Sequence, residues 1–131
     1  MASECRFSLS RASAADLAEL ARVQYRSFGP FMREIFMGCK SEADLPLITQ
    51  KYASELAEDP HDLWIKVVDT ASGNIVAGSN WKVYPNAAPD SSDDKLTEWL
   101  DGETRETAIK VLRKVTKVRK IANKEGGYIR Q

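Results

Sequence analysis

The sequence predicts an α+β (α/β-like) domain in which helices pack on a mixed or antiparallel sheet of about three to four strands. The main observation is a β-hairpin over residues 64–84. Two runs rich in Trp, Ile, Val and Tyr flank a break at 70–74, where Gly73 and Asn74 tolerate the positive φ of a tight reversal. Apolar residues before and after this hairpin recur at helical spacing. The chain has 131 residues, which suits one domain spanning 1–131.

Local signals place the elements that precede the hairpin. Residues 5–11 alternate apolar and polar side chains, which predicts a half-buried strand. Helices are predicted between residues 15 and 58, and two Ser-x-x-Asp spacings resemble helix-opening capping arrangements. These pairs are Ser13 with Asp16 and Ser41 with Asp44. The helical pieces end at breaking residues: Gly29-Pro30, Gly38 and Asp59-Pro60.

The hairpin and the segment after it complete the predicted fold. Neither face of the first hairpin strand is cleanly polar, which predicts a sheet covered on both sides. A polar loop is predicted over 85–94, followed by a helix over 103–124 that acids lead and cations end. Gly126-Gly127 ends this helix, and a further strand is predicted to begin at 128–129.

Composition and charge exclude several functional classes. The net charge is zero, so no global field attracts nucleic acid or an anionic membrane. No apolar run is long enough to span a bilayer, and the N-terminus lacks the apolar core of a signal peptide. Cys5 and Cys39 fit no metal-binding spacing and are expected to be free thiols. We therefore expect no membrane partner and a location in the cytoplasm or the nucleus.

The order strand, helices, hairpin resembles the N-terminal half of a GNAT-type N-acetyltransferase. In that family the second and third strands form a hairpin with the pattern D-x-x-x-G-x-I-V-G. Here Asp69, Gly73, Ile75 and Val76 match, with Ala77-Gly78 in place of the final Gly. The run at 81–85, followed by a polar loop and a helix before the next strand, is similar to the subgroup common in filamentous fungi.

This resemblance covers essentially the whole chain and implies a partial GNAT fold. It also implies transfer of an acetyl group from acetyl-CoA to an amine-bearing small molecule or peptide, by direct attack of the amine on the thioester. A backbone N–H on the fourth strand would stabilise the oxyanion. The resemblance assigns no catalytic side chain within these residues.

The family's acetyl-CoA loop, [QR]-x-x-G-x-[GA], is absent from the sequence. In the family this loop holds the CoA pyrophosphate on backbone N–H groups. The nearest match is 26–31, where Phe31 fills the last position and Pro30 removes an N–H donor. The sequence therefore resembles a half enzyme that stops before the cofactor site, and we expect the chain alone to be inactive and to have no cofactor-binding residues.

The resemblance also indicates where an acceptor amine would bind. By analogy with the family, Phe28, Phe31, Met32 and Trp81 would line the acceptor groove. The alternative is that these large apolar side chains belong to the hydrophobic core, which is the commoner role of such residues.

Other chemistry-bearing residues have a simpler interpretation. His61 lies in a polar turn and is expected to be solvated. One histidine and two unrelated cysteines support neither a nucleophilic triad nor a metal site. The acids at 90–101 do not have the spacing of a calcium loop, so a solvated acidic surface is expected. The basic residues at 110–124 lack interleaved aromatics that could stack on bases. We therefore expect a solvated basic face there and no nucleic-acid partner.

Two hypotheses therefore stand beside each other. The first is a GNAT-type N-acetyltransferase that uses acetyl-CoA and is truncated before the pyrophosphate loop. The second is a non-catalytic, GNAT-like binding or oligomerisation module, in which an exposed sheet edge beside Tyr84 or Tyr128 allows homo-oligomers.

Overall fold

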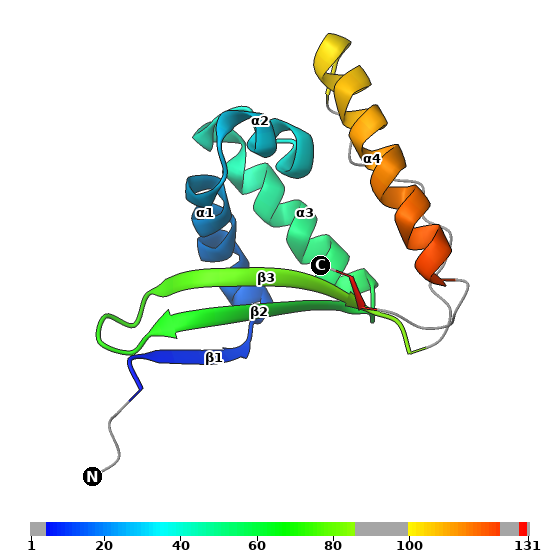
Figure 1. Cartoon of the computed structure of the whole chain (residues 1–131). Coiled ribbons are helices and arrows are strands. Elements are labelled where there is room, and N and C mark those ends of the chain that lie inside the picture. The colour runs from blue at the N-terminus through cyan, green and yellow to red at the C-terminus, as the bar shows by residue number, and fades with distance from the viewer. Residues whose placement is uncertain (1–4, 86–99, 124–128, 131) are drawn as a thin grey trace.

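The structure, a computed structural model, describes residues 5–85, 100–123 and 129–130. Its sheet contains β1 (Phe7–Arg11), β2 (Asp62–Asp69), β3 (Ile75–Val83) and β4 (Ile129–Arg130). The strands lie in the order β1-β2-β3-β4, every neighbouring pair is antiparallel, and the helices lie on one side of the sheet (Figure 1). The predicted α+β class with an antiparallel sheet is confirmed.

The helices begin and end where the local signals predict. Two 3₁₀ turns, η1 (Ala14–Asp16) and η3 (Glu42–Asp44), lead into α1 (Leu17–Ser27) and α3 (Leu45–Glu58). The Asp16 carboxylate accepts the Ser13 N–H at 2.9 Å, and the Asp44 carboxylate accepts the Ser41 N–H at 3.2 Å, which confirms both capping pairs. Between α1 and α3 lie the short α2 (Pro30–Met32) and the π-helix η2 (Arg33–Met37).

The end of η2 and the long C-terminal helix also follow the sequence pattern. Gly38 ends η2 in the left-handed region, with φ of 67°, a conformation that favours glycine. After the hairpin, α4 (Gly102–Asn123) is close to the predicted range of 103–124. The predicted polar loop at 85–94 lies almost entirely outside the described residues.

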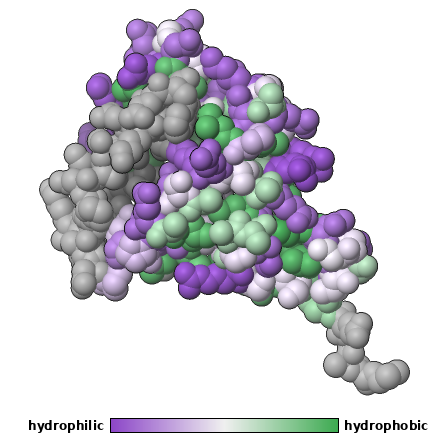
Figure 2. Space-filling model, turned by 180° about the vertical axis from the view of Figure 1, so that it is seen from behind, coloured by the Kyte–Doolittle hydropathy of each residue, from purple (hydrophilic) through white to green (hydrophobic). Residues whose placement is uncertain are grey.

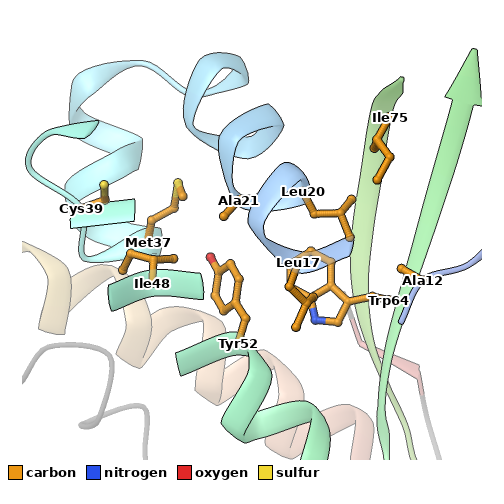
Figure 3. Close-up of a cluster of buried hydrophobic side chains, with 10 residues drawn as sticks. All are labelled: Ala12, Leu17, Leu20, Ala21, Met37, Cys39, Ile48, Tyr52, Trp64 and Ile75. Atoms are coloured by element: carbon orange, nitrogen blue, oxygen red, sulfur yellow. The ribbon is translucent and has the colours of Figure 1, made fainter. Parts of the chain in front are cut away.

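The main hydrophobic core lies between the helices and one face of β2 and β3. Leu17, Leu20 and Ala21 of α1 meet side chains of α3 and of the sheet, as Figure 3 shows. The rings of Tyr52 and Trp64 lie 5.1 Å apart at this junction. A second buried cluster joins η2 to α4 and contains Ile35, Leu100 and Ala108. The predicted apolar stripes of α1 and α3 therefore face the core.

A β-bulge in the hairpin decides which β3 residues face this core. Val67 pairs with Ala77, but its neighbour Val68 pairs with Ile75, so Val76 has no partner on β2. The extra residue places Ile75 on the helix side together with Gly78. A Cβ on Gly78 would collide with Cδ2 of buried Leu20, so a larger residue would force Leu20 to shift where α1 approaches β3.

The opposite side of the sheet, which we call the open face, carries apolar side chains that the helices do not cover. Strand alternation places Phe7, Leu9, Ile65, Val67 and Trp81 there. Phe7 is 50% exposed and Leu9 is 71% exposed. The expectation of a sheet covered on both sides is therefore wrong for the described part of the chain, where the helices pack on one face only (Figure 1).

Candidate functional site

The structure separates the predicted acceptor residues into three environments. Phe28 follows α1 as its C-terminal cap and packs, partly buried, against the main core. Phe31 and Met32 lie on α2, where Phe31 is 58% exposed and Met32 is 37% exposed. The core interpretation therefore fits Phe28, while Phe31 and Met32 are available to a ligand.

Trp81 lies on the opposite side of the sheet from these residues. It pairs with Leu63, while its neighbours Asn80 and Lys82 pair with Trp64 and Asp62 of the helix side. Alternation along β3 therefore directs Trp81 to the open face, where its Nε1–H donates to Ser79 Oγ at 2.7 Å. One groove lined by all four residues is not formed, because the β-bulge places Trp81 away from α1 and α2.

The segment formed by α2 and η2 holds exposed apolar side chains on a fixed backbone. Arg33 Nε donates to the carbonyl oxygen of Tyr25 at 2.6 Å, and its guanidinium lies 3.9 Å from the centre of the Tyr25 ring. Ile35 is fully buried beneath the segment, while Phe36 is 37% exposed. Phe31, Met32 and Phe36 together form what we call the α2–η2 apolar surface. A π-helix in this position is a feature often found at functional sites.

A polar cluster at the base of the hairpin is the second candidate. Lys82 Nζ lies 2.9 Å from Asp59 Oδ2 and 3.0 Å from Asp62 Oδ1. Asn80 Nδ2 also donates to Asp62 Oδ1, at 2.8 Å. The Asp62 side chain has no exposed surface and the Lys82 side chain is 13% exposed. We call Asp59, Asp62, Asn80 and Lys82 the hairpin-base cluster.

Mutual contacts fix the charges in this cluster. Burial alone would lower the pKa of Lys82, but hydrogen bonds to Asp59 and Asp62 outweigh it and hold the pKa above 10.5. Burial alone would raise the pKa of Asp59, but hydrogen bonds from Lys82 and from the His61 N–H lower it below 3.8. Lys82 is therefore a cation at neutral pH and does not have the character of a general base.

One atom of the hairpin-base cluster has unused hydrogen-bonding capacity. Asp62 Oδ2 is buried and has no hydrogen-bond partner among the described residues, in contrast to Oδ1. In the described part of the chain, no three His, Cys, Asp or Glu side chains are arranged to hold a metal ion. The cluster is thus an ion pair with one spare carboxylate oxygen, and it stabilises the base of the hairpin.

His61 is more ordered than its sequence context indicates. Its ring is half-buried, with Nδ1 at 3.0 Å from the Val83 carbonyl oxygen and the ring centre 4.8 Å from that of Tyr84. Since a carbonyl oxygen only accepts, Nδ1 carries the proton of this hydrogen bond. The expectation of a solvated side chain is wrong because His61 closes the hairpin base against the end of β3.

Sequence reasoning missed the hairpin-base cluster because the strand was predicted to start at Trp64. Asp62 is in fact the first residue of β2, and it pairs directly with Lys82. The signal that could have found it is the opposite charge of the two residues on either side of the hairpin. To use that signal, one must know which residues pair across the hairpin. The bulge at Val76 shifts this pairing by one residue, so it could not be read from the spacing alone.

The surface of α4 agrees with the solvated-face interpretation of its basic residues. Lys110, Arg113, Lys114 and Lys117 are exposed, as are the acids Glu103 and Glu106 of the same helix.

On the side shown in Figure 2, hydrophobic residues gather across the lower middle, with hydrophilic residues around them. The acids at 90–98 lie outside the described residues.

Comparison of the chain with protein-family models, with curated proteins and with solved structures found no match. Within the residues that the structure describes, no helix combines the length and the apolar character that crossing a bilayer requires.

Proposed function

We propose that this chain forms the acceptor-binding, N-terminal half of a GNAT-type N-acetyltransferase, whose substrate is an amine-bearing small molecule or peptide. The observation that carries the proposal is the order of the elements. A strand is followed by helices, by the β2–β3 hairpin, by α4 and then by β4, which pairs with β3 through Val83 and Lys82. This is the order on which the family resemblance rests, including a helix before the fourth strand.

The α2–η2 apolar surface supports an acceptor site on the helix side. Phe31, Met32 and Phe36 leave large apolar areas in solvent, although the backbone beneath them is anchored by buried Ile35 and by Arg33. Exposed apolar side chains on an anchored segment are typical of a surface that a ligand covers. Trp81 is excluded from this acceptor site by its place on the open face.

We infer that the described residues of this chain do not hold the CoA diphosphate. The nearest match to the family's loop lies at the junction of α1 and α2, where Pro30 occupies the first turn and has no N–H to offer. Acetyl-CoA would therefore be held by a segment that the sequence does not contain. We expect no micromolar binding of acetyl-CoA by the 131-residue chain in titration calorimetry, and such binding would contradict this part of the proposal.

The decisive test is the reading frame after the codon for Gln131. The proposal expects it to continue β4 and then to encode a glycine-rich loop, and it expects the extended protein to acetylate amines. In that protein, Phe31→Ser and Met32→Ser should raise the KM for the amine and leave the Kd for acetyl-CoA unchanged. Leu47→Ser is the matched control, because Leu47 is 60% exposed on α3 and lies outside the α2–η2 apolar surface. A frame that lacks such a loop would refute the enzymatic function.

A non-catalytic binding or oligomerisation module is the second candidate, and the uncovered open face favours it. Leu9 and Phe7 expose apolar area that a catalytic role does not explain. This candidate expects partner binding or self-association without acetyl-CoA, which light scattering of the purified chain tests. A strictly monomeric chain would count against it.

For either function we propose a reducing compartment, the cytoplasm or the nucleus. The support is that Cys5 and Cys39 are both free thiols in the structure, with Cys5 exposed. Fluorescence microscopy of the tagged protein tests the location.

A further inference from the structure

The outer edge of β1 is exposed, and two arginines, Arg6 and Arg11, bound its uncharged part. In the described part of the chain β1 pairs with β2 alone, and all its residues are exposed. The helices pack on the other strands, so β1 lies at the side of the sheet farthest from them (Figure 1). Neither proline, nor a bulge, nor a charged residue interrupts the run from Phe7 to Ser10.

The backbone direction of β1 shows which residues offer hydrogen bonds at this edge. The carbonyl oxygen of Arg6 accepts the Thr70 N–H, and the Ala12 N–H donates to the Trp64 carbonyl oxygen, each at 2.8 Å. Even-numbered residues therefore direct their backbone groups toward β2. Because the direction alternates along a strand, Phe7 and Leu9 direct theirs outward.

We propose that two copies of this chain associate through antiparallel pairing of their β1 strands, centred on Ser8. In this register Phe7 of each copy faces Leu9 of the other, and the two residues exchange their outward backbone hydrogen bonds. Ser8 faces Ser8 in the other copy as a non-hydrogen-bonded pair. The two sheets then form one continuous sheet with both open faces on the same side.

The side chains of β1 make it complementary to itself. The pairing places the four large apolar side chains, Phe7 and Leu9 of each copy, beside one another on the open face, where they shield each other from water. Arg6 faces Ser10, and Arg11 faces Cys5, so no two like charges are opposed. Arg6 also forms an ion pair with Asp69 of its own copy, at 3.3 Å. To pair equally well with β1, a strand of another protein would need the same alternation of apolar and small polar residues.

We expect a reversible dimer, because one short strand forms less contact than a standard interface of roughly 1,200–2,000 Å². Sedimentation equilibrium should show the mass rising with concentration, over the micromolar range, from 14.6 kDa toward twice that value. A chain that stays monomeric at millimolar concentration would overturn the proposal.

Cysteine cross-linking tests the register. In a Cys5→Ser background, Ser8→Cys should give a disulfide-linked dimer under mild oxidation, because residues in a non-hydrogen-bonded pair have Cα atoms about 4.5 Å apart, within disulfide range. Ser10→Cys is the matched control, because Ser10 is also exposed on the same face but the two Ser10 residues would lie roughly 13 Å apart. Equal cross-linking of both variants, or of neither, would overturn the proposed register.

A proline pair separates loss of the dimer from loss of the fold. Leu9→Pro removes an outward N–H and should abolish the dimer, while thermal unfolding of the monomer shows little change. Ser8→Pro removes an N–H that β2 accepts and should lower the melting temperature clearly. A dimer that persists in the Leu9→Pro variant would show that another surface mediates the association.

Discussion

Replacing Lys82 with methionine should destabilise the protein by about 3–5 kcal/mol, the cost of removing one partner from a buried ion pair. The Lys82 ammonium lies 3.0 Å from Asp62 Oδ1, and the Asp62 side chain has no exposed surface. At an effective dielectric constant of about 20, two unit charges at this distance attract by roughly 5–6 kcal/mol. Methionine fills a similar volume, so the main change is a buried carboxylate without its cation.

Urea unfolding followed by circular dichroism measures this loss as a lower midpoint with an unchanged slope. Lys40→Met is the matched control, because Lys40 Nζ is 3.7 Å from Asp101 and both side chains are largely exposed. It should cost less than about 1 kcal/mol. Adding Asp62→Asn to Lys82→Met should recover part of the stability, because the buried negative charge is then removed.

Two results would refute this reasoning. A Lys82→Met variant within about 1 kcal/mol of the wild type would show that water reaches the pair and screens it. Strict additivity of Lys82→Met and Asp62→Asn would show that the two charges do not interact. If Lys82→Met does not fold, Lys82→Arg, which keeps the charge, should still fold.

Two further predictions concern pH and the contact between α1 and β3. The lowered pKa of Asp59 contributes stability above about pH 3.8, and this stability is lost as the pH falls through the folded-state pKa. The raised pKa of Lys82 contributes stability below about pH 10.5, and this stability is lost as the pH rises through the folded-state pKa. Melting temperatures should therefore fall at both extremes; a profile flat below pH 4 would contradict the first contribution. Gly78→Ala should cost about 1–3 kcal/mol in urea unfolding, since its Cβ meets buried Leu20, whereas Gly29→Ala, with open space around its Cβ, should cost less than half as much.

The fold was predictable from sequence to the extent that its signals are local. Ser13 and Asp16 open the first helical segment through contacts between residues three positions apart. Gly73 turns the hairpin with φ of 75°, and Gly38 ends η2 in the same region of backbone space. Each of these signals depends only on residues within a few positions of one another. The local sequence is therefore enough to predict where these helices and turns begin and end.

The candidate sites were predictable only in part, because they depend on which strand face each residue occupies. Phe31 and Met32 were predicted to line an acceptor groove, with a place in the hydrophobic core as the alternative, and the structure leaves both exposed. Trp81 was grouped with them, although it belongs to the open face. The first hairpin strand was predicted to start at Trp64, so the ion pair of Asp62 with Lys82 was not anticipated.

By itself the sequence determined the order of the elements and the ends of the helices, because capping residues, turn glycines and hydrophobic periodicity act locally. Only the tertiary structure decided the faces of β3. Its bulge at Val76 is accommodated by α1, whose Leu20 occupies the space above Gly78 and whose Glu19 accepts the Ile75 N–H at 3.0 Å. A shift of one residue exchanges the two faces of a strand, and the contacts that fix this shift come from residues more than fifty positions away.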